Sequence, residues 1–397
     1  MTTNERLPTR VQVAIVGGGP AGLLLARKLS RSDIDCAIIE RHSRQYVMSR
    51  IRAGVLEQGS VDQLREAGLG ARIDEEGLVH EGCEIADDEG SFRLDFLDLA
   101  SKTVTVYGQT EVTRDLYSAL EDDGVVIADN SGGVEIDGIE SGRPVIAFQR
   151  RGRDHAIKCD FVAGCDGFHG VSRNCIPEHV RTTYERSFGF GWLGMLSESP
   201  PVNHELVYCR SGRGFALASM RSPCLSRYYL QVPLSDRVED WDDDRFWKEL
   251  ALRIPVEISH RLQPGRTVEK SITPIRSFVS EPMSWGWLFL CGDSSHIVPP
   301  TGAKGLNLAL SDVHYLHAAL VRRIHGGDDE LLNGYSQTAL ARVWKSMRFS
   351  WWMTNLLHLH PGMEAFEQRV QDAEFAQLRD TRLARQIAAE NYTGLGY

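Results

Sequence analysis

The sequence predicts a mixed α/β fold with three parts: an α/β domain built on a parallel sheet, a β-rich part, and a helical C-terminal region. Residues 11–16 form a short, mostly apolar run ending in glycines, which is typical of a strand buried on both faces of a sheet. Residues 184–233 are rich in aromatic and β-branched residues broken by Gly, Pro and Ser, which favours antiparallel strands. The whole chain after about Leu306 has helical character.

The first forty residues read as a βαβ-like unit. Residues 20–31 predict a helix with an apolar side, and residues 34–39 predict a second buried strand that ends at Glu40. This order implies a parallel sheet. A polar, Arg-rich stretch follows, and residues 56–66 then predict a helix.

Later elements return to the same pattern after the β-rich part. Strands are predicted at residues 161–163, 276–279 and 287–291, with helices at residues 243–254 and from about Ala303. We therefore expect an α/β domain assembled from separated stretches. The predicted division is 1–180 (with 73–105 partly contributing to the second domain), 181–268 as the β-rich domain, 269–350 completing the first domain, and 351–397 as a helical C-terminal region.

Composition narrows the class of protein. The 397 residues carry a formal net charge of −10, which argues against non-specific binding to nucleic acid or anionic membrane. The polar first ten residues and the absence of an apolar run of about 18 residues predict a cytoplasmic protein. None of the eight scattered cysteines has CxxC spacing, so neither a disulfide framework nor a zinc site is expected.

A glycine-rich motif lies between the first predicted strand and helix. Residues 17–22 read Gly-Gly-Gly-Pro-Ala-Gly, a GxGxxG fingerprint, and Glu40 closes the next strand. Gly17 makes the tight turn, Gly19 lets a pyrophosphate approach the backbone, and Gly22 lets helix and strand pack closely. The helix N-terminus faces the phosphates, and Glu40 is placed to accept from a ribose hydroxyl. The pattern predicts a dinucleotide site.

Two further motifs indicate which dinucleotide binds. Asp166-Gly167 and Gly292-Asp293 each follow an apolar strand, and the second leads into a Pro-Pro-Thr-Gly loop and a helix. With the fingerprint, they match the group A flavoprotein monooxygenases in order and spacing. Within that group the chain resembles the 4-hydroxybenzoate 3-monooxygenases from residue 11 to residue 397. The stretches that carry the resemblance are RIRAGVLEQG (50–59), VYGQTEVTRDL (106–116), GCDGFHGVSR (164–173), FGWLG (190–194), SRYYLQVPL (226–234), IVPPTGAKGLNLA (297–309), RFSWWMT (348–354) and AENY (389–392).

The resemblance implies a Rossmann-like FAD-binding domain and a set of cofactor contacts. It places the loop of residues 301–307 around the isoalloxazine ring and gives Asp166 a supporting role in the cofactor domain. The residues implied to hold FAD are Gly17, Gly19, Gly22, Glu40, Arg52, Gln109, Asp293, Gly305, Leu306 and Asn307.

The resemblance also implies a site for a small aromatic acid that reacts with O2. The substrate carboxylate would pair with Arg221, assisted by Ser219 and Tyr229, because a guanidinium binds a carboxylate with two parallel hydrogen bonds. Tyr208 and the carbonyl of Pro300 would face the phenol oxygen, and a relay through Tyr392 to His80 would carry its proton to solvent. The implied reaction is hydroxylation of 4-hydroxybenzoate at ring position 3 through a flavin C4a-hydroperoxide. The implied pocket wall includes Val55, Trp192, Leu206 and Leu217.

The nicotinamide donor must bind elsewhere, because FAD occupies the one fingerprint. The resemblance implies that NADPH, or NADH, binds transiently on Arg41, Tyr46, Arg50, His169, Arg173 and Arg276, while Arg227 helps couple flavin movement to substrate binding. A homodimer is also expected, since dimers are common in the family.

Several departures from the family pattern leave alternatives open. This chain has Met220 between the substrate-binding Ser and Arg, Gly189 before FGWLG, and Ser294-Ser295 after the GD motif. Within the family, the alternative is hydroxylation of a substituted substrate such as 3-amino-4-hydroxybenzoate, at position 2. Outside it, a plain NAD(P)-dependent dehydrogenase would be colourless, and a catalytically silent flavin-binding protein would not need the substrate residues.

Overall fold

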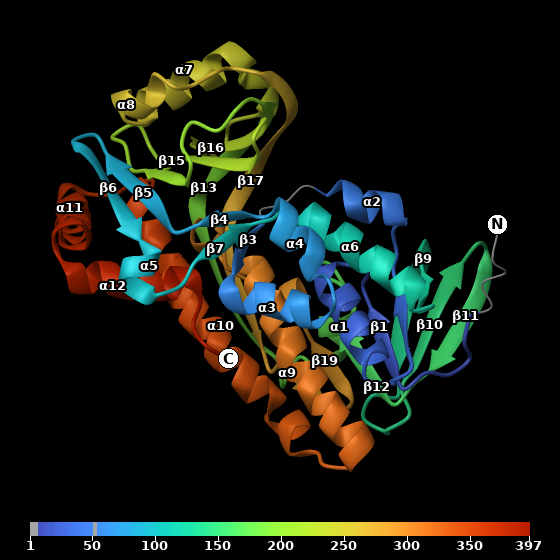
Figure 1. Cartoon of the computed structure of the whole chain (residues 1–397). Helices are drawn as coiled ribbons and strands as arrows, with labels where there is room; N and C mark the ends of the chain where they lie inside the picture. Colours follow the sequence, from blue (N-terminus) through green and yellow to red (C-terminus); the bar gives the residue numbers. More distant parts are fainter. Residues whose placement is uncertain (1–6, 51–53) are drawn as a thin grey trace.

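The computed structural model describes residues 7–50 and 54–397, and a six-stranded sheet lies at its centre. The strand order is β18(Ser284–Trp285)-β19(Leu288–Leu290)-β12(Phe161–Gly164)-β1(Val13–Val16)-β2(Cys36–Ile39)-β8(Val126–Ala128), and all neighbours except β18 and β19 are parallel. Figure 1 shows this sheet beside the long helices α9(Gly305–Gly326) and α10(Glu330–Leu357).

Both faces of the parallel sheet are buried, which explains its continuous apolar strands. Along β1, Val13 and Ile15 pack in the cluster formed with helices α1(Pro20–Ser30), α6(Gln109–Asp122), α9 and α10. Ala14 and Val16 point the other way, into a cluster with a three-stranded antiparallel sheet. The strands of that sheet are β9(Ser131–Asp137), β10(Val145–Arg150) and β11(Arg153–Lys158).

A second, eight-stranded sheet is almost entirely antiparallel. Its order is β20(His296–Ile297)-β17(Arg266–Glu281)-β13(Thr182–Glu198)-β16(Leu225–Pro233)-β15(Ala216–Ser222)-β14(Val207–Cys209)-β5(Gly82–Asp87)-β6(Gly90–Asp95), with β14 and β5 parallel. One face packs against α7(Asp243–Arg253) and α8(Val256–Ser259), at the top of Figure 1. The other face packs against α5(Phe96–Ala100), the C-terminal end of α10, α11(Ala365–Asp380) and α12(Arg382–Thr393).

Smaller elements connect the two sheets. A three-stranded antiparallel sheet has the order β3(Val55–Glu57)-β7(Val104–Val106)-β4(Leu78–His80). The remaining helices are α2(Arg44–Ser49), α3(Gln58–Glu66) and α4(Gly70–Glu76), and short 3-10 turns are η1(Ser172–Cys175), η2(Val238–Asp240), η3(Gly292–Ser294) and η4(Pro300–Gly302).

The predicted α/β class is confirmed, and most predicted elements agree with the structure within two residues of their ends. The helix predicted from Leu56 was wrong at its start, because Val55 to Glu57 pair with β7 and the helix begins only at Gln58. The predicted strand at 276–279 is one part of the much longer β17, which crosses the boundary predicted at 268–269. The division into domains stays a prediction.

Candidate functional site

The glycine-rich motif forms a cradle at the carboxyl end of β1. Gly17 has φ +109°, and a Cβ there would lie 2.3 Å from the carbonyl oxygen of Cys165, so only glycine fits. Gly19 is the N-cap of α1, and a Cβ on it would meet no atom within 4 Å. Gly22 lies where the start of α1 packs against the Gly17 carbonyl. The backbone therefore borders open space at a helix N-terminus, which fits the approach of a pyrophosphate.

Glu40 lies beside this cradle, at the end of β2. Its Oε2 accepts from the Gly18 N–H (2.6 Å) and its Oε1 from the His42 N–H (2.8 Å). Each carboxylate oxygen can still accept another hydrogen bond. The buried Glu40 is thus held in one orientation and keeps the capacity to accept from a ribose hydroxyl.

Asp166 supports the cradle from the neighbouring strand β12. Its Oδ2 accepts from the N–H and the hydroxyl of Ser172 (2.9 and 3.0 Å). Burial raises the pKa of Asp166, and the hydrogen bonds from Ser172 counteract part of that shift. These contacts hold the turn after β12 against η1, and the role of Asp166 in the cofactor domain stays a prediction.

The remaining predicted FAD residues lie on three other elements. Gln109 begins α6, Asp293 lies in η3, and residues 305–307 begin α9. The Asn307 side chain is already engaged, since its Oδ1 accepts from the Glu57 N–H and its Nδ2 donates to the Val55 carbonyl (both 2.9 Å). The Asn307 side chain is therefore occupied by contacts within the protein, and only the backbone of this residue can contact the cofactor. Arg52 lies outside the described residues.

A buried group of charges that sequence reasoning missed lies under this loop. Lys304 Nζ donates to Glu57 Oε1 (2.6 Å) and to the backbone carbonyl of Tyr392 (2.8 Å), and Arg342 donates to Glu57 Oε2 (3.0 Å). Burial lowers the pKa of Lys304, and Glu57 offsets part of that shift. These contacts hold Tyr392 against β3 and α9. No sequence pattern marks them, because a Lys and an Arg among helical residues are expected at the surface.

Side chains predicted to bind substrate lie on one face of the antiparallel sheet. Tyr208 pairs with Leu217, Leu217 with Tyr229, and Tyr229 with Gly194. Residues paired directly across strands share a face, so this row places Tyr208, Leu217 and Tyr229 together. Trp192, two residues from Gly194, has the same alternation, and its ring lies 4.9 Å from that of Tyr229.

Arg221 lies at a bulge near the end of β15, where the register with β16 shifts between Met220 and Ser222. Its side chain is half-buried, and among the described residues its Nε has no hydrogen-bond partner. Burial lowers the pKa of Arg221, and Tyr229 offsets part of that shift. A bulge re-aims a side chain, and an unmatched buried guanidinium donor fits an anionic ligand. Ser219 is nearby, but its hydroxyl donates to the Arg227 carbonyl (3.0 Å).

Tyr208 and Tyr392 form the predicted hydroxyl pair. Their Oη atoms lie 2.7 Å apart, and both side chains are buried. Burial raises the pKa of both tyrosines well above the usual range. Either hydroxyl can donate, so a proton can pass between them in either direction.

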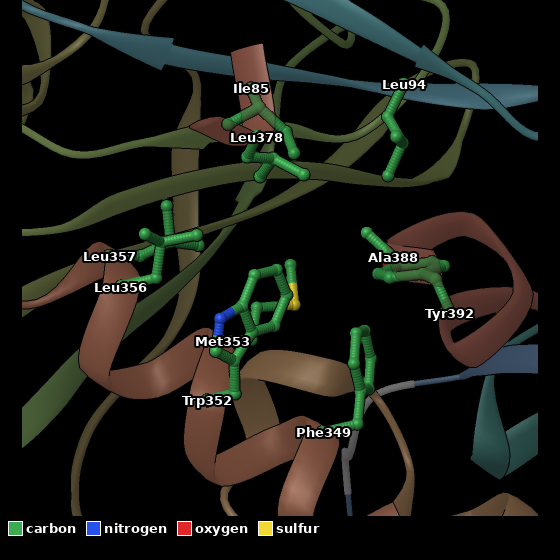
Figure 2. Close-up of a pocket in the computed structure, with 10 residues that line it drawn as sticks. All are labelled: Ile85, Leu94, Phe349, Trp352, Met353, Leu356, Leu357, Leu378, Ala388 and Tyr392. Atoms are coloured by element: carbon green, nitrogen blue, oxygen red, sulfur yellow. The ribbon is translucent and has the colours of Figure 1, made fainter. Parts of the chain in front are cut away.

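A small apolar cavity of about 10 Å³ lies beside Tyr392, as Figure 2 shows. Its other lining residues come from β5, β6, α10, α11 and α12, and all are apolar in character (Ile85, Leu94, Phe349, Trp352, Met353, Leu356, Leu357, Leu378 and Ala388). A space of this size and lining does not hold a water molecule well. The cavity is not the substrate site, but it surrounds one side of Tyr392 with a dry environment.

We expected His80 to connect the proton relay from Tyr392 to solvent, but its side chain is buried in this structure. It is 1% exposed, and its Nε2 lies 3.2 Å from the sulfur of Met220. Among the described residues its Nδ1 has no hydrogen-bond partner. Burial lowers the pKa of His80 to about 4. The long apolar side chain at Met220 therefore shields the imidazole in this structure.

Pro300 lies at the start of η4 and is exposed. Its carbonyl accepts from the Ala303 N–H (2.9 Å), which closes the turn. A carbonyl oxygen has a second lone pair, so this bond leaves Pro300 able to accept from a phenol as well.

The residues predicted to bind nicotinamide form two groups. Around α2, the Arg50 guanidinium lies 5.7 Å from the ring of Tyr46, and Arg41 donates to His42 (3.1 Å), whose ring stacks on Tyr46. The second group lies around Phe168. Its members are His169, Arg173 and Arg276.

Arg173 in the second group also holds the cofactor turns together. Its guanidinium donates to the carbonyls of Ser294 and Phe168 (both 2.8 Å), which joins the turn after β12 to η3. Burial lowers the pKa of Arg173, and the nearby Arg181 adds to that effect. At least part of its role is thus to fix the protein's own backbone.

Comparisons with known proteins agree with this geometry. A family model described as FAD binding domain matches residues 10–350. The chain is 49% identical over 389 residues to the p-hydroxybenzoate hydroxylase of Acinetobacter baylyi, covering 98% of this chain and 96% of that protein. It is 27% identical to the tetracenomycin A2 monooxygenase-dioxygenase of Streptomyces glaucescens, covering 86% of this chain and 66% of that protein.

Solved structures share the fold. The crystal structure of p-nitrophenol 4-monooxygenase from Pseudomonas putida superposes with a TM-score of 0.78 and 18% identity, covering 98% of this chain and all of that chain. At this level of identity, the likeness shows the arrangement of helices and strands alone. Among the described residues, the structure contains no helix long and apolar enough to cross a membrane.

Proposed function

The chain belongs to the FAD-binding family of flavin-dependent aromatic monooxygenases, and from that premise we propose that it hydroxylates 4-hydroxybenzoate at ring position 3. The product is 3,4-dihydroxybenzoate, and the reaction consumes O2 and a nicotinamide donor. FAD as the cofactor and NAD(P)H as the reductant, both predicted from the sequence, are confirmed by the family match and the p-hydroxybenzoate hydroxylase relative.

One observation carries the proposal: a guanidinium whose buried Nε–H has no partner among the described residues lies on the same sheet as Tyr208, whose hydroxyl pairs with that of Tyr392 on α12. The guanidinium is that of Arg221 on β15, and Tyr208 lies on the neighbouring strand β14. An aromatic acid with a para-hydroxyl group carries an anion at one end and a phenol at the other. The two ends of the site match the two ends of such a molecule in chemical type.

The proposed mechanism assigns each protein group to one end of the substrate. Arg221 binds the carboxylate in a charge-assisted pair, with Tyr229 beside it and Ser219 two residues earlier on the same strand. Tyr208 Oη donates a hydrogen bond to the developing phenolate oxygen, which lowers the pKa of the phenol and makes the ring a better nucleophile. The Pro300 carbonyl faces the same oxygen and accepts from the phenol before its proton leaves.

Removal of the phenol proton starts with the tyrosine pair. When Tyr208 Oη accepts that proton, it passes its own to Tyr392 Oη, 2.7 Å away. We propose that the proton then travels on to the buried Nδ1 of His80, which has no hydrogen-bond partner among the described residues and so does not contact Tyr392 Oη directly. Its low pKa, about 4, makes it a transient carrier that releases the proton readily.

When bound, FAD supplies the redox chemistry that accepts two electrons from the nicotinamide donor and activates O2. The residues that fit it are Gly17, Gly19, Gly22, Glu40, Gln109, Asp293, and the backbone of residues 305–307, with Arg52 as a further proposed contact. The chain's apolar walls, Val55, Trp192, Leu206 and Leu217, exclude water, which protects the activated oxygen from wasteful decay.

We place the nicotinamide donor transiently on the two groups around Tyr46 and Phe168. Both present guanidinium groups next to aromatic rings, which suits a molecule with phosphates and flat bases. Arg41 and Tyr46 favour NADPH over NADH as the donor.

The deciding experiment is product analysis. Purified yellow enzyme is incubated with 4-hydroxybenzoate, O2 and NADPH, and the product is identified by mass spectrometry and NMR. We expect 3,4-dihydroxybenzoate, with NADPH oxidation strongly accelerated by the aromatic acid. Failure to bind FAD, or equal NADPH oxidation with and without the acid, contradicts the proposal. A product formed only from 3-amino-4-hydroxybenzoate, hydroxylated at position 2, would favour the alternative within the family.

A homodimer is supported by exposed apolar side chains spaced along the C-terminal helices. Trp344 and Trp351 are seven residues apart on α10, and the pairs Phe366 with Val370 and Leu383 with Ile387 are each four residues apart on α11 and α12. Such spacing gathers side chains on one face of a helix. Sedimentation velocity should give twice the monomer mass. We also propose a cytoplasmic location, which the eight free cysteines support.

A further inference from the structure

A buried hydrogen bond joins the substrate wall to the end of α10. The indole Nε1 of Trp192 lies 2.7 Å from Nε2 of His358, and the two side chains are 4% and 0% exposed. An indole N–H only donates, so Nε2 must accept and carries no proton. The proton is therefore on Nδ1, which lies 2.9 Å from the carbonyl oxygen of Thr354. These two contacts fix His358 as the neutral ring with its proton on Nδ1.

The same turn of α10 also holds the turn that carries Pro300. Thr354 Oγ1 donates its only proton to the Ser350 carbonyl (2.7 Å), so it accepts from the hydroxyl of Thr301 (2.8 Å). Thr301 follows Pro300 in η4. The last turn of α10 thus contacts one side of the proposed substrate site through His358 and the other side through Thr354.

Ring stacking extends the influence of His358 across the sheet. Its imidazole lies 4.8 Å from the ring of Phe190 and 4.2 Å from that of Phe215. Phe215 in turn stacks on Trp192 at 5.0 Å, and Trp192 lies 4.9 Å from Tyr229. A change in the tilt of the His358 ring is therefore transmitted to the aromatic residues beside Arg221.

We infer that His358 is a positioning residue: its neutral imidazole fixes the indole of Trp192 and, through Thr354, ties the substrate wall to the turn that carries Pro300. The inference rests on the proposed function, because Trp192 lines the site where the aromatic acid binds. His358 does not itself line the proposed substrate site, and it acts through Trp192, Thr354 and the rings stacked on its imidazole. Loss of the bond would leave a buried indole N–H without a partner, and the ring would reorient to find one.

The kinetic test compares variants that separate the hydrogen bond from the packing. His358→Phe keeps the aromatic stack and removes the acceptor. We expect the KM for 4-hydroxybenzoate to rise about tenfold, corresponding to about 1.4 kcal/mol, with kcat changed much less. His358→Gln, which retains an acceptor, should recover most of the loss. The control is His360→Phe, two residues further along the chain, whose Nε2 has no partner among the described residues and whose KM should match wild type.

Additivity gives a second kinetic criterion. Trp192→Phe removes the donor, so the double variant with His358→Phe should be no worse than Trp192→Phe alone. A wild-type KM in His358→Phe, or losses that simply add in the double variant, would overturn the inference. Wild-type enzyme that fails to convert 4-hydroxybenzoate would instead overturn the proposed substrate.

The hydrogen bond itself is measured without substrate. In uniformly ¹⁵N-labelled holoenzyme, the indole resonance of Trp192 is assigned by its absence from Trp192→Phe. We expect it to shift in His358→Phe and to stay in place in His360→Phe. A resonance unmoved by His358→Phe would refute the bond, whatever the enzyme's substrate proves to be.

Discussion

The two large sheets of the molecule position functional groups by different means. At the carboxyl end of the parallel sheet, the site is made by the backbone: Gly17 adopts φ +109°, and Gly19 begins α1 beside open space. On the antiparallel sheet, the site is made by side chains in a cross-strand row, including Tyr208 and Tyr229. The cofactor cradle therefore depends on the positions of glycines in the sequence. The proposed substrate site depends on which side chains lie on the same face of the antiparallel sheet.

This difference determines how each site tolerates change. A side chain added to the cradle collides with protein backbone or with the ligand, and a small substitution has a large effect. A substitution in the row of side chains removes one interaction and leaves the sheet intact. Cofactor binding and substrate chemistry should therefore be separable by mutation.

The largest effect is expected at the cradle. Gly17→Val places a Cβ 2.3 Å from the Cys165 carbonyl oxygen in a left-handed backbone conformation, and FAD retention should be lost. Gly19→Ala meets no protein atom within 4 Å, so it should fold with wild-type stability and yet bind FAD about 100-fold more weakly, or about 2.7 kcal/mol. Thermal unfolding and FAD fluorescence titration separate the two, with Gly334→Ala as control. Tight FAD binding by Gly19→Ala would contradict the cradle.

Tyr208→Phe should break the substrate chemistry while leaving the cradle intact. The phenyl ring keeps the packing, but the hydroxyl 2.7 Å from Tyr392 is lost. Hydroxylation should slow by roughly 100- to 10,000-fold, the usual contribution of general acid–base catalysis, while NADPH is still consumed. The measurement is the ratio of hydroxylated product to NADPH oxidised, with hydrogen peroxide assayed alongside. A variant that still converts most of its NADPH into product would remove Tyr208 from the mechanism.

Arg221→Lys should weaken substrate binding with FAD affinity unchanged. A desolvated charge pair contributes about 2–5 kcal/mol, and an ammonium does not reproduce the two parallel hydrogen bonds of a guanidinium. We expect at least a 30-fold rise in the dissociation constant of 4-hydroxybenzoate, measured by the change in flavin absorbance. Arg237→Lys, on the exposed surface, is the matched control. Equal affinity in wild type and Arg221→Lys would place the carboxylate elsewhere.

Sequence reasoning predicted the backbone site far better than the side-chain site. The GxGxxG spacing and Glu40 have a physical meaning wherever they lie between a strand and a helix, and the structure has them there. Arg221 and Tyr208, by contrast, were identified only through a family resemblance, since alternation marks a face but not its function. The buried contacts of Lys304 and His358 join elements far apart in sequence, so no local pattern reveals them.

Met220, where this chain departs from the family pattern, is a second case in which a local sequence pattern does not reveal a contact between distant elements. Its position between Ser219 and Arg221 was evident, but its contact with His80 requires β4 and β15 to be placed in space. In this structure His80 is buried, because burial depends on the side chains that cover a residue, and these are distant in the chain. Its part in a proton relay stays a prediction.

The smallest expected effect concerns the stability of the protein in acid. On the side of the antiparallel sheet, burial lowers the pKa of His358 to about 3 and that of His80 to about 4. At the parallel sheet, Asp312 raises the pKa of His296 against the opposing effect of burial, and burial lowers that of His317 to about 4.

A histidine kept neutral in the folded state takes up a proton only on unfolding. Its contribution to stability is therefore present above about pH 6.5 and is lost as the pH falls towards the folded-state pKa. His296 has the opposite sign, since its stabilising effect is present at low pH and lost as the pH rises through its raised value.

We therefore expect His358→Phe to flatten the acid limb of the stability curve. Between pH 8 and pH 5, His358 takes up a proton in the unfolded state, where its pKa is near 6.5, but stays neutral in the folded state. This difference lowers the free energy of unfolding of wild type by about 2 kcal/mol. The variant lacks that group, so its free energy of unfolding, from urea titrations followed by tryptophan fluorescence, should fall by about 2 kcal/mol less over this range. His260→Gln, at an exposed position, should leave the wild-type slope unchanged. An identical slope in wild type and His358→Phe would mean that folding does not lower the pKa of His358. Its ring would then be protonated at pH 5 in the folded protein, and a protonated ring has no acceptor for the Trp192 indole. That result would refute the bond on which the positioning role depends.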